Sequence, residues 1–247
     1  MATSPISVQL YTVREALAHD VPGTLRRLAD LGLTQVEPFD LTARAAALAP
    51  ALAEAGLSAP TAHARVVGED LDAVFAAATA LGTGTVIDPR VATDRWHTAG
   101  SIASIADDLN AAAAVAARHG VRVGYHNHAQ EVEVVLDGRT ALEVLADHLD
   151  EAVVLEVDAY WAAVGGQDPV ALLRRLGTRV VALHLKDGPG TPEVLDQVAL
   201  GSGGQPLREV VEAAPHALRV VELDDCRGDR FAAVADSLTW LRAQGLA

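Results

Sequence analysis

The feature that most limits the fold is a repeated unit: a helical pattern, then Leu-x-x-Gly or a close variant, then an apolar strand. It occurs in five places, at residues 28–37, 52–60, 78–88, 116–126 and 173–184. The glycine of each unit is suited to the left-handed conformation that ends many helices. Short links of this kind between a helix and the next strand are typical of parallel βα units.

Counting these units along the chain predicts eight strands and eight helices. The strands fall near 5–11, 33–38, 57–62, 84–88, 121–127, 153–158, 179–185 and 218–223. The helices fall near 22–31, 43–55, 70–81, 101–119, 139–148, 169–176, 205–214 and 229–244. Eight alternations in about 250 residues match one (β/α)₈ TIM barrel. A doubly wound sheet fits less well, because no Gly-x-Gly-x-x-Gly follows the first strand. We therefore expect an α/β chain that forms a single TIM-barrel domain over residues 1–247.

The charge of the chain argues against two classes of partner. The formal net charge is −14, and 50% of the residues are apolar. A nucleic-acid binder relies on Lys and Arg to neutralise phosphates, and an anionic membrane surface attracts the same residues. No apolar stretch is long enough to span a bilayer, and the start of the chain lacks a basic segment followed by an apolar one. With Cys226 as the only cysteine, no internal disulfide can form, so we expect a cytoplasmic protein.

Four late strands end in polar side chains that can bind metals: YHNHAQE (125–131), LEVDAYW (155–161), LHLKD (183–187) and VVELDD (220–225). Residues two apart on a strand point the same way, so these polar groups share the side that faces the barrel axis. Buried carboxylates and imidazoles must be paired or bound. Asp158 and His184 lie on strands six and seven, and Glu131 and Glu222 flank them. Three carboxylates and one imidazole suit Mn²⁺, Mg²⁺ or Co²⁺ and admit Zn²⁺.

The chain resembles the sugar phosphate isomerase/epimerase family of xylose isomerase-like barrels. The resemblance rests on Tyr-His-Asn-His-x-x-Glu, Asp-x-Tyr-Trp, His-x-Lys-Asp and Val-Glu-x-Asp in this order at the strand ends. It extends to SVQLYTVRE (7–15), to Glu37 in QVEPF and to His63 in TAHA, and so covers nearly the whole chain. An aromatic residue often follows the strand-five glutamate of the family, but this chain has Val132 there and Glu133 next. The strand-five ligand is therefore Glu131 or Glu133, and the register of the motif favours Glu131.

This resemblance implies roles for particular residues. It implies metal ligation by Glu131, Asp158, His184 and Glu222. It also implies substrate contacts from Glu37, His63 and His128, and an oxyanion partner in Lys186. In the family's chemistry the metal polarises a carbonyl and stabilises an ene-diolate. Glu131 and Glu222 are the expected acid/base pair, and the expected activity is a sugar or keto-sugar isomerase or epimerase.

The aromatic residues favour a small carbohydrate ligand. Six of the nine lie at or just past the ends of predicted strands: Tyr11, Phe39, Trp96, Tyr125, Tyr160 and Trp161. Apolar walls with a few polar groups are typical of small-ligand pockets, and Trp161 is a candidate to pack on a sugar. The glycine-rich segment LGSGGQP (200–206) fits either a flexible loop or a phosphate cradle. Barrels of this kind often associate, so a homo-oligomer is a further expectation.

Other functions stay open at this stage. The main alternative is a dehydratase or lyase on a keto-inositol or 3-keto-glycoside, which uses the same proton abstraction and then expels a hydroxyl. A non-catalytic sugar binder would lack a metal ligand, and none of the four is missing. A metal nuclease for damaged DNA fits poorly with the net charge of −14. Asp158 and Glu222 could instead form structural ion pairs with Lys186 or Arg227.

Overall fold

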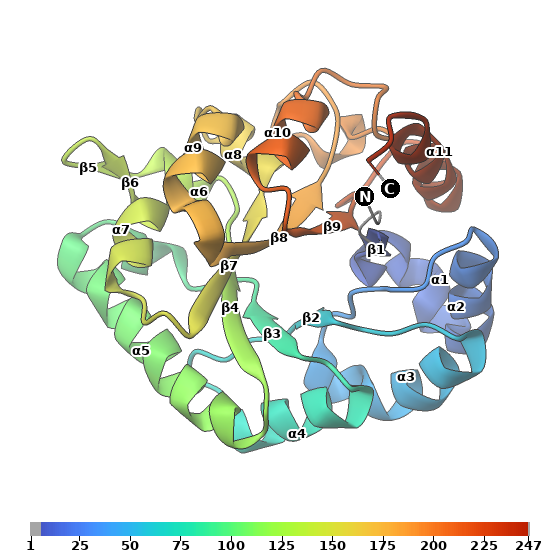
Figure 1. Ribbon diagram of the computed structural model, residues 1–247, viewed down its shortest axis with the longest axis horizontal. Coiled ribbons are helices and arrows are strands. Elements are labelled where there is room, and N and C mark those ends of the chain that lie inside the picture. Colours follow the sequence, from blue (N-terminus) through green and yellow to red (C-terminus); the bar gives the residue numbers. More distant parts are fainter. Residues whose placement is uncertain (1–5, 247) are drawn as a thin grey trace.

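Seven parallel strands form the centre of the molecule, as the computed structural model shows (Figure 1). The structure describes residues 6–246. The strand order is β1-β9-β8-β7-β4-β3-β2, and each neighbouring pair is parallel. The strands are β1 (Ile6–Val8), β2 (Thr61–His63), β3 (Thr85–Asp88), β4 (Arg122–His126), β7 (Val153–Asp158), β8 (Val180–Leu185) and β9 (Leu218–Val221). Pro5, which begins the predicted 5–11 strand, lies outside the described residues, as do the other residues of 1–5, on which part of the leader expectation rests.

The predicted second strand closes the barrel through isolated bridges. Residues 34–38 lie between the two outer strands of the sheet, with parallel bridges from Gln35 to Ser58 and from Gln9 to Glu37. The backbone of Glu37 donates to Val8 at 2.8 Å and accepts from Leu10 at 2.8 Å. Regular pairing stops at Pro38 because proline has no N–H to donate. The segment predicted as the second strand therefore lies where the barrel needs an eighth strand, but it forms isolated bridges instead of a continuous ladder.

Helices surround the sheet on its outer side (Figure 1). The eight that the sequence predicts are α2 (Val21–Asp30), α3 (Leu41–Ala55), α4 (Leu71–Leu81), α5 (Ala99–Arg118), α7 (Ala141–His148), α9 (Pro169–Leu176), α10 (Leu207–Ala213) and α11 (Arg230–Ala243). The five glycines of the repeated unit all have positive φ, from 58° to 84°, as expected: Gly32, Gly56, Gly82, Gly120 and Gly177. The (β/α)₈ alternation of the sequence is thus the alternation of the structure.

Several short elements interrupt the connections and were not expected from the sequence. They are α1 (Arg14–His19), α6 (Gln130–Glu133), α8 (Ala159–Val164), the hairpin of β5 (Val135–Leu136) and β6 (Arg139–Thr140), and the 3₁₀ helices η1 (Leu10–Val13), η2 (Thr93–Trp96), η3 (Gly177–Arg179) and η4 (Val194–Asp196). Most of them follow the carboxyl ends of strands, which is the end of a barrel that carries function. No helix among residues 6–246 combines the length and apolar character needed to cross a membrane.

The glycine-rich segment 200–206 is tied down by a carboxylate of the protein itself. Asp187, at the end of β8, is buried and accepts hydrogen bonds from the backbone N–H groups of Gly188, Gly201, Gly203 and Gln205 at 2.8–3.0 Å. A Cβ on Gly203 would lie 2.2 Å from Asp187 Oδ1, so only glycine fits there. The amides that the sequence offered as a phosphate cradle therefore bind Asp187 instead.

We expect Asp187→Ala to destabilise the protein by roughly 2–4 kcal/mol, because it leaves four backbone donors without their acceptor. Chemical denaturation measures this change. The matched control is Asp107→Ala, which removes an exposed carboxylate from α5. Equal unfolding midpoints for the two variants would contradict the anchoring role of Asp187.

Candidate metal centre and substrate pocket

Three of the four predicted metal ligands meet at the carboxyl ends of neighbouring strands. Asp158 ends β7, His184 lies near the end of β8, and Glu222 directly follows β9. One ligand atom of each lies within 4.8 Å of the other two, and all three side chains are buried. His184 Nδ1 and Glu222 Oε2 are 2.5 Å apart. The three side chains thus present two oxygens and a nitrogen to one point at the barrel mouth.

Lys186 holds the carboxylates of this centre together. It is the only lysine in the sequence. It lies two residues after His184, so the two side chains point to the same face of the extended chain. Its Nζ is 2.9 Å from Asp158 Oδ2, 2.9 Å from Glu222 Oε2 and 2.8 Å from Asp224 Oδ2. Burial opposes its charge, but attraction from these carboxylates outweighs burial and raises the pKa of Lys186 well above its usual value. Lys186 is therefore a buried ammonium ion.

A second layer of polar groups lies beneath the first. Glu156 Oε2 is 2.6 Å from His63 Nε2, 3.1 Å from His126 Nδ1 and 3.1 Å from His184 Nε2. Together these four side chains form another group whose ligand atoms lie within 4.8 Å of one another. Glu37 Oε1 joins them: it lies 2.7 Å from His184 Nε2 and accepts from Gln9 Nε2 at 2.9 Å.

This lower layer determines which nitrogen each imidazole presents above it. His184 directs Nε2 down to Glu37 and Glu156, which leaves Nδ1 beside Glu222. His126 directs Nδ1 to Glu156, which leaves Nε2 at 3.9 Å from Asp158 Oδ2. A carboxylate behind a histidine ligand fixes its ring orientation in many metal sites. The same relation holds here for both imidazoles.

Five side-chain atoms in the two layers are buried without a hydrogen bond among the described residues. In the upper layer these atoms are Asp158 Oδ2 and His184 Nδ1, and in the lower layer they are Glu37 Oε2, His126 Nδ1 and Glu156 Oε1. Charged neighbours lie close to both upper atoms, Lys186 to the first and Glu222 to the second, but out of line for hydrogen bonding. Buried polar atoms are rarely left in this state unless they bind something. The donor set, two carboxylates and one or two imidazoles, fits a divalent transition metal.

Glu131, the predicted strand-five ligand, does not reach this centre. The chain leaves β4 after His126 and turns into α6, where Glu131 lies. Its carboxylate is buried and accepts from Tyr125 Oη at 2.7 Å, from His128 N at 2.8 Å and from Gln130 Nε2 at 2.9 Å. Glu131 is absent from both groups of ligand atoms in the described chain, and so is the alternative, Glu133.

His126 is the strand-five histidine closest to Asp158, with Nε2 3.9 Å from Asp158 Oδ2, and it belongs to the lower group of ligand atoms. It is the last residue of β4, as Asp158 is of β7, and it pairs in register with Glu156. The sequence contained the signal: in YHNH the strand ends at the first histidine, so the side chain at the barrel mouth is an imidazole. The rings of His126 and His128 lie next to each other, with centroids 5.0 Å apart, although the strand ends at His126.

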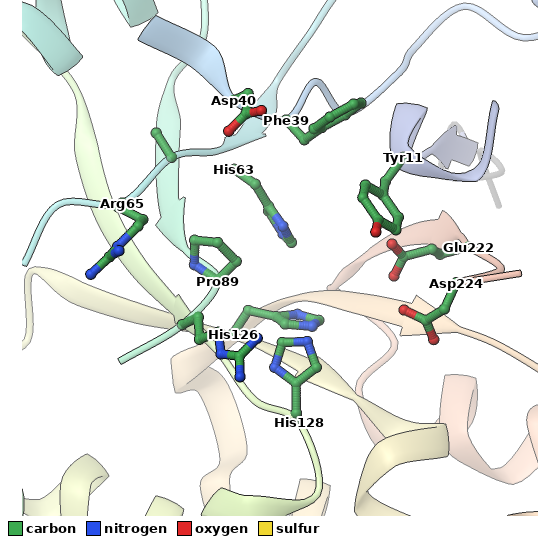
Figure 2. Close-up of a pocket in the computed structure, with 12 residues that line it drawn as sticks. Tyr11, Phe39, Asp40, His63, Arg65, Pro89, His126, His128, Glu222 and Asp224 are labelled. Carbon is green, nitrogen blue, oxygen red and sulfur yellow. The ribbon is translucent and has the colours of Figure 1, made fainter. Parts of the chain in front are cut away.

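A pocket opens directly above the centre (Figure 2). Its volume is about 270 Å³, and its lining includes His63, His126, His128, Glu222 and Asp224. Figure 2 shows Tyr11 and Phe39 along one wall, and their rings meet edge to face at 5.3 Å between centroids. Apolar walls around a few convergent polar groups are typical of a small-molecule site.

The remaining predicted substrate contacts have different positions. Glu37 is fully buried among Gln9, His63 and His184 and does not line the pocket, so it positions histidines. Trp161 lines an adjoining hollow together with His128, and its Nε1 donates to Asp224 Oδ2 at 3.1 Å. His63 and His128 both line the main pocket.

The protonation states of the centre follow from burial and charge. Burial raises the pKa of Asp158 to about 6, although Lys186 opposes the shift. Burial works against the charged form of His184, but Glu156 and Glu222 outweigh it and raise the pKa of that imidazole well above its usual value. Burial lowers the pKa of His128 to about 4, so this pocket histidine is neutral at pH 7.

Comparison with known proteins places the fold in a family. Residues 14–244 match the family model described as xylose isomerase-like TIM barrel. A solved sugar phosphate isomerase/epimerase from Parabacteroides distasonis superposes with a TM-score of 0.83 at 23% identity, over 100% of this chain and 96% of that one. The IOLI protein with a bound zinc atom superposes with a TM-score of 0.73 at 13% identity, over 98% of each chain. At these identities the two structures establish the fold alone, and they confirm the predicted barrel.

One curated relative shares a stretch of sequence. Inosose dehydratase from Geobacillus kaustophilus is 37% identical over 84 residues, which cover 34% of this chain and 27% of that protein. The chain therefore spans only part of the length of this relative.

We expect Mn²⁺ affinity to depend on pH in two regimes. Above pH 6, metal binding must displace one proton from His184. The affinity for Mn²⁺ therefore rises about tenfold for each unit by which the pH rises. Below the Asp158 pKa of about 6, a second proton must leave and the dependence steepens. Calorimetric titration with Mn²⁺ between pH 5 and 8 gives the slopes, and a flat profile would contradict this arrangement.

Metal affinity also distinguishes His126 from Glu131 as the ligand that the strand-five region supplies. We expect His126→Ala to weaken Mn²⁺ binding by more than about tenfold, because Nε2 faces the orphaned oxygen of Asp158. Glu131→Gln should change it little, because that carboxylate binds Tyr125 and the backbone. Calorimetry on both variants makes the comparison. The opposite ranking would return the ligand role to Glu131.

Proposed function

The chain belongs to the xylose isomerase-like TIM barrel family, and on this premise we propose that it is a divalent-metal-dependent isomerase or epimerase of a sugar or keto-sugar. The observation that carries the proposal is the meeting of Asp158, His184 and Glu222 beside a pocket that Glu222 lines, with Asp158 Oδ2 and His184 Nδ1 left without hydrogen bonds. The isomerase/epimerase from Parabacteroides distasonis, which has the same fold, is consistent with it.

We propose that Asp158, His184, Glu222 and His126 hold the ion. A set of two carboxylates and two imidazoles suits Mn²⁺, Co²⁺ or Zn²⁺ better than Mg²⁺, which prefers oxygen. The zinc atom of the IOLI protein agrees with this choice. When bound, the ion supplies a Lewis acid that polarises a carbonyl and stabilises the negative charge that develops when a neighbouring carbon loses its proton.

The residues of the chain supply the proton transfer. Attraction from Lys186 and His184 overcomes burial and holds the pKa of Glu222 well below its usual value, so Glu222 is an ionised carboxylate at the pocket wall. It is our candidate for the base that removes the proton. His63 and His128 line the same pocket and can hydrogen-bond substrate hydroxyls. Lys186 compensates the charge that arises beside Asp158 and Glu222.

We propose a different second member of the acid/base pair. Glu131 is fully buried, hydrogen-bonded and absent from the pocket lining, which leaves it poorly placed to reach a substrate. Its contacts with Tyr125 and with the backbone of His128 suit a positioning role. His128, neutral at pH 7 and exposed to the pocket, is the better candidate to exchange a proton with the substrate.

A dehydratase or lyase on a keto-inositol or 3-keto-glycoside is the second candidate. The observation that favours it is the 84-residue match to inosose dehydratase at 37% identity. Both reactions begin with loss of the proton next to a carbonyl. They differ in the next step, because the dehydratase expels a hydroxyl as water and the epimerase returns a proton.

We expect the Mn²⁺-loaded protein to incorporate deuterium from D₂O next to the carbonyl of its ketose or keto-inositol substrate. Glu222→Gln should slow this exchange by about 10²–10⁴-fold, since the amide cannot take the proton. Proton NMR follows the exchange, and circular dichroism checks that the variant is folded.

The products of the same incubation separate the two candidates. Deuterium incorporation without loss of water supports the isomerase or epimerase, and an unsaturated product supports the dehydratase. Wild-type exchange rates in a folded Glu222→Gln variant would remove Glu222 from the mechanism.

A further inference from the structure

The pocket has opposite charges on opposite sides. Glu222 and Asp224 lie on one side, and Figure 2 shows Arg65 on the other. Arg90 belongs to the same lining. In a chain with 33 acidic and 19 basic residues, two arginines at one pocket are a local exception. The metal-binding groups and the arginines therefore face different parts of whatever occupies the pocket.

A buried carboxylate places the two arginines on adjacent loops. Asp88, the last residue of β3, accepts hydrogen bonds from the backbone N–H groups of Val66 and Val67 at 2.8 and 3.0 Å. It also accepts from the backbone N–H of Arg90 at 2.9 Å. One side chain thus joins the loop after β2, which carries Arg65, to the loop after β3, which carries Arg90. This scaffold is built into the barrel and does not depend on a ligand.

The charges of the two guanidinium groups are little used within the protein. Arg90 has no ion pair within 4.0 Å among residues 6–246, and it is exposed. Arg65 approaches only Glu69, at 3.9 Å between Nε and Oε1, with both side chains largely exposed. Asp40 shares the pocket rim but lies beside Arg44, at 4.0 Å. Arg90 also borders the adjoining hollow that His128, Glu133 and Trp161 line.

The other feature of the sequence that could bind an anion is already occupied. The backbone amides of the glycine-rich segment 200–206 donate to Asp187. An anionic group in the pocket would therefore meet Arg65 and Arg90. The guanidinium group binds carboxylate and phosphate in a planar, two-pronged geometry.

We propose that Arg65 and Arg90 form a subsite for an anionic substituent, a phosphate or a carboxylate, on the part of the substrate that lies away from the metal centre. This assignment rests on the proposed function for the identity of the reacting end. It makes the substrate class an acidic or phosphorylated keto-sugar, and it makes Arg65 and Arg90 determinants of specificity.

Three ligands with one carbon skeleton test the subsite: D-fructose, D-fructose 6-phosphate and D-fructuronate. Calorimetry measures their binding to the Mn²⁺-loaded protein, with inorganic phosphate as a fourth probe. We expect at least one of the two anionic sugars to bind about tenfold or more tightly than fructose, and Arg90→Ala and Arg65→Ala each to remove most of that preference. The affinity for fructose should change less than about twofold. The tighter anion identifies the substituent as phosphate or carboxylate.

Arg118→Ala is the matched control, because Arg118 ends α5 and pairs with Asp72 outside the pocket. It should retain the wild-type preference. Equal binding of all three sugars, equal losses for fructose and the anions in the Arg90 variant, or no binding of any anionic probe would overturn the subsite. The binding experiment needs no turnover. A protein that exchanges no substrate proton in D₂O would therefore refute the proposed function without deciding whether Arg65 and Arg90 bind an anion.

Discussion

The structure of the site depends on the Glu156 carboxylate buried beneath it. One oxygen of Glu156 lies within 3.1 Å of nitrogens from three imidazoles that come from different strands: His63, His126 and His184. An ionised carboxylate without such partners would be costly at this depth. Attraction from the imidazoles outweighs burial and lowers the pKa of Glu156 well below its usual value. Each ring that satisfies Glu156 with one nitrogen is turned so that its other nitrogen faces elsewhere, and for His126 and His184 that direction is the upper centre.

The single lysine of the sequence has a physical reason for its position. All other basic residues of the chain, apart from histidines, are arginines, whose planar guanidinium spreads five donors over a wide fork. Lys186 instead places a compact charge among three carboxylate oxygens at 2.8–2.9 Å, two of which belong to the candidate metal ligands. A lysine can fill that small space and still leave the ligand atoms directed at a common point. Arg65 and Arg90 instead line the open pocket, where we propose that their wide forks bind the substrate.

The sequence predicted the barrel because its signals are local and repeated. The five glycines of the repeat have the positive φ values expected of them, and the eight helices lie close to their predicted ranges. The sequence also predicted that Asp158, His184 and Glu222 would lie together, since each ends an apolar strand, and the structure places them within 4.8 Å of one another. The role of Glu131 stays a prediction, because its position depends on whether the chain stays extended for five more residues or turns into α6, as it does here. The sequence could not join Arg65 to Arg90, because the link is a tertiary contact through Asp88.

The buried acids of this centre differ in the direction of their pKa shifts. Glu156 and Glu222 are held ionised by neighbouring positive charge, whereas burial raises the pKa values of Glu37 and Asp158. Asp158 Oδ2 lies 2.9 Å from Lys186 Nζ, yet it makes no hydrogen bond. A divalent ion at that atom would supply a contact that the protein does not provide. It would bind the folded chain in preference to the unfolded one, and would so couple occupancy of the site to the stability of the barrel.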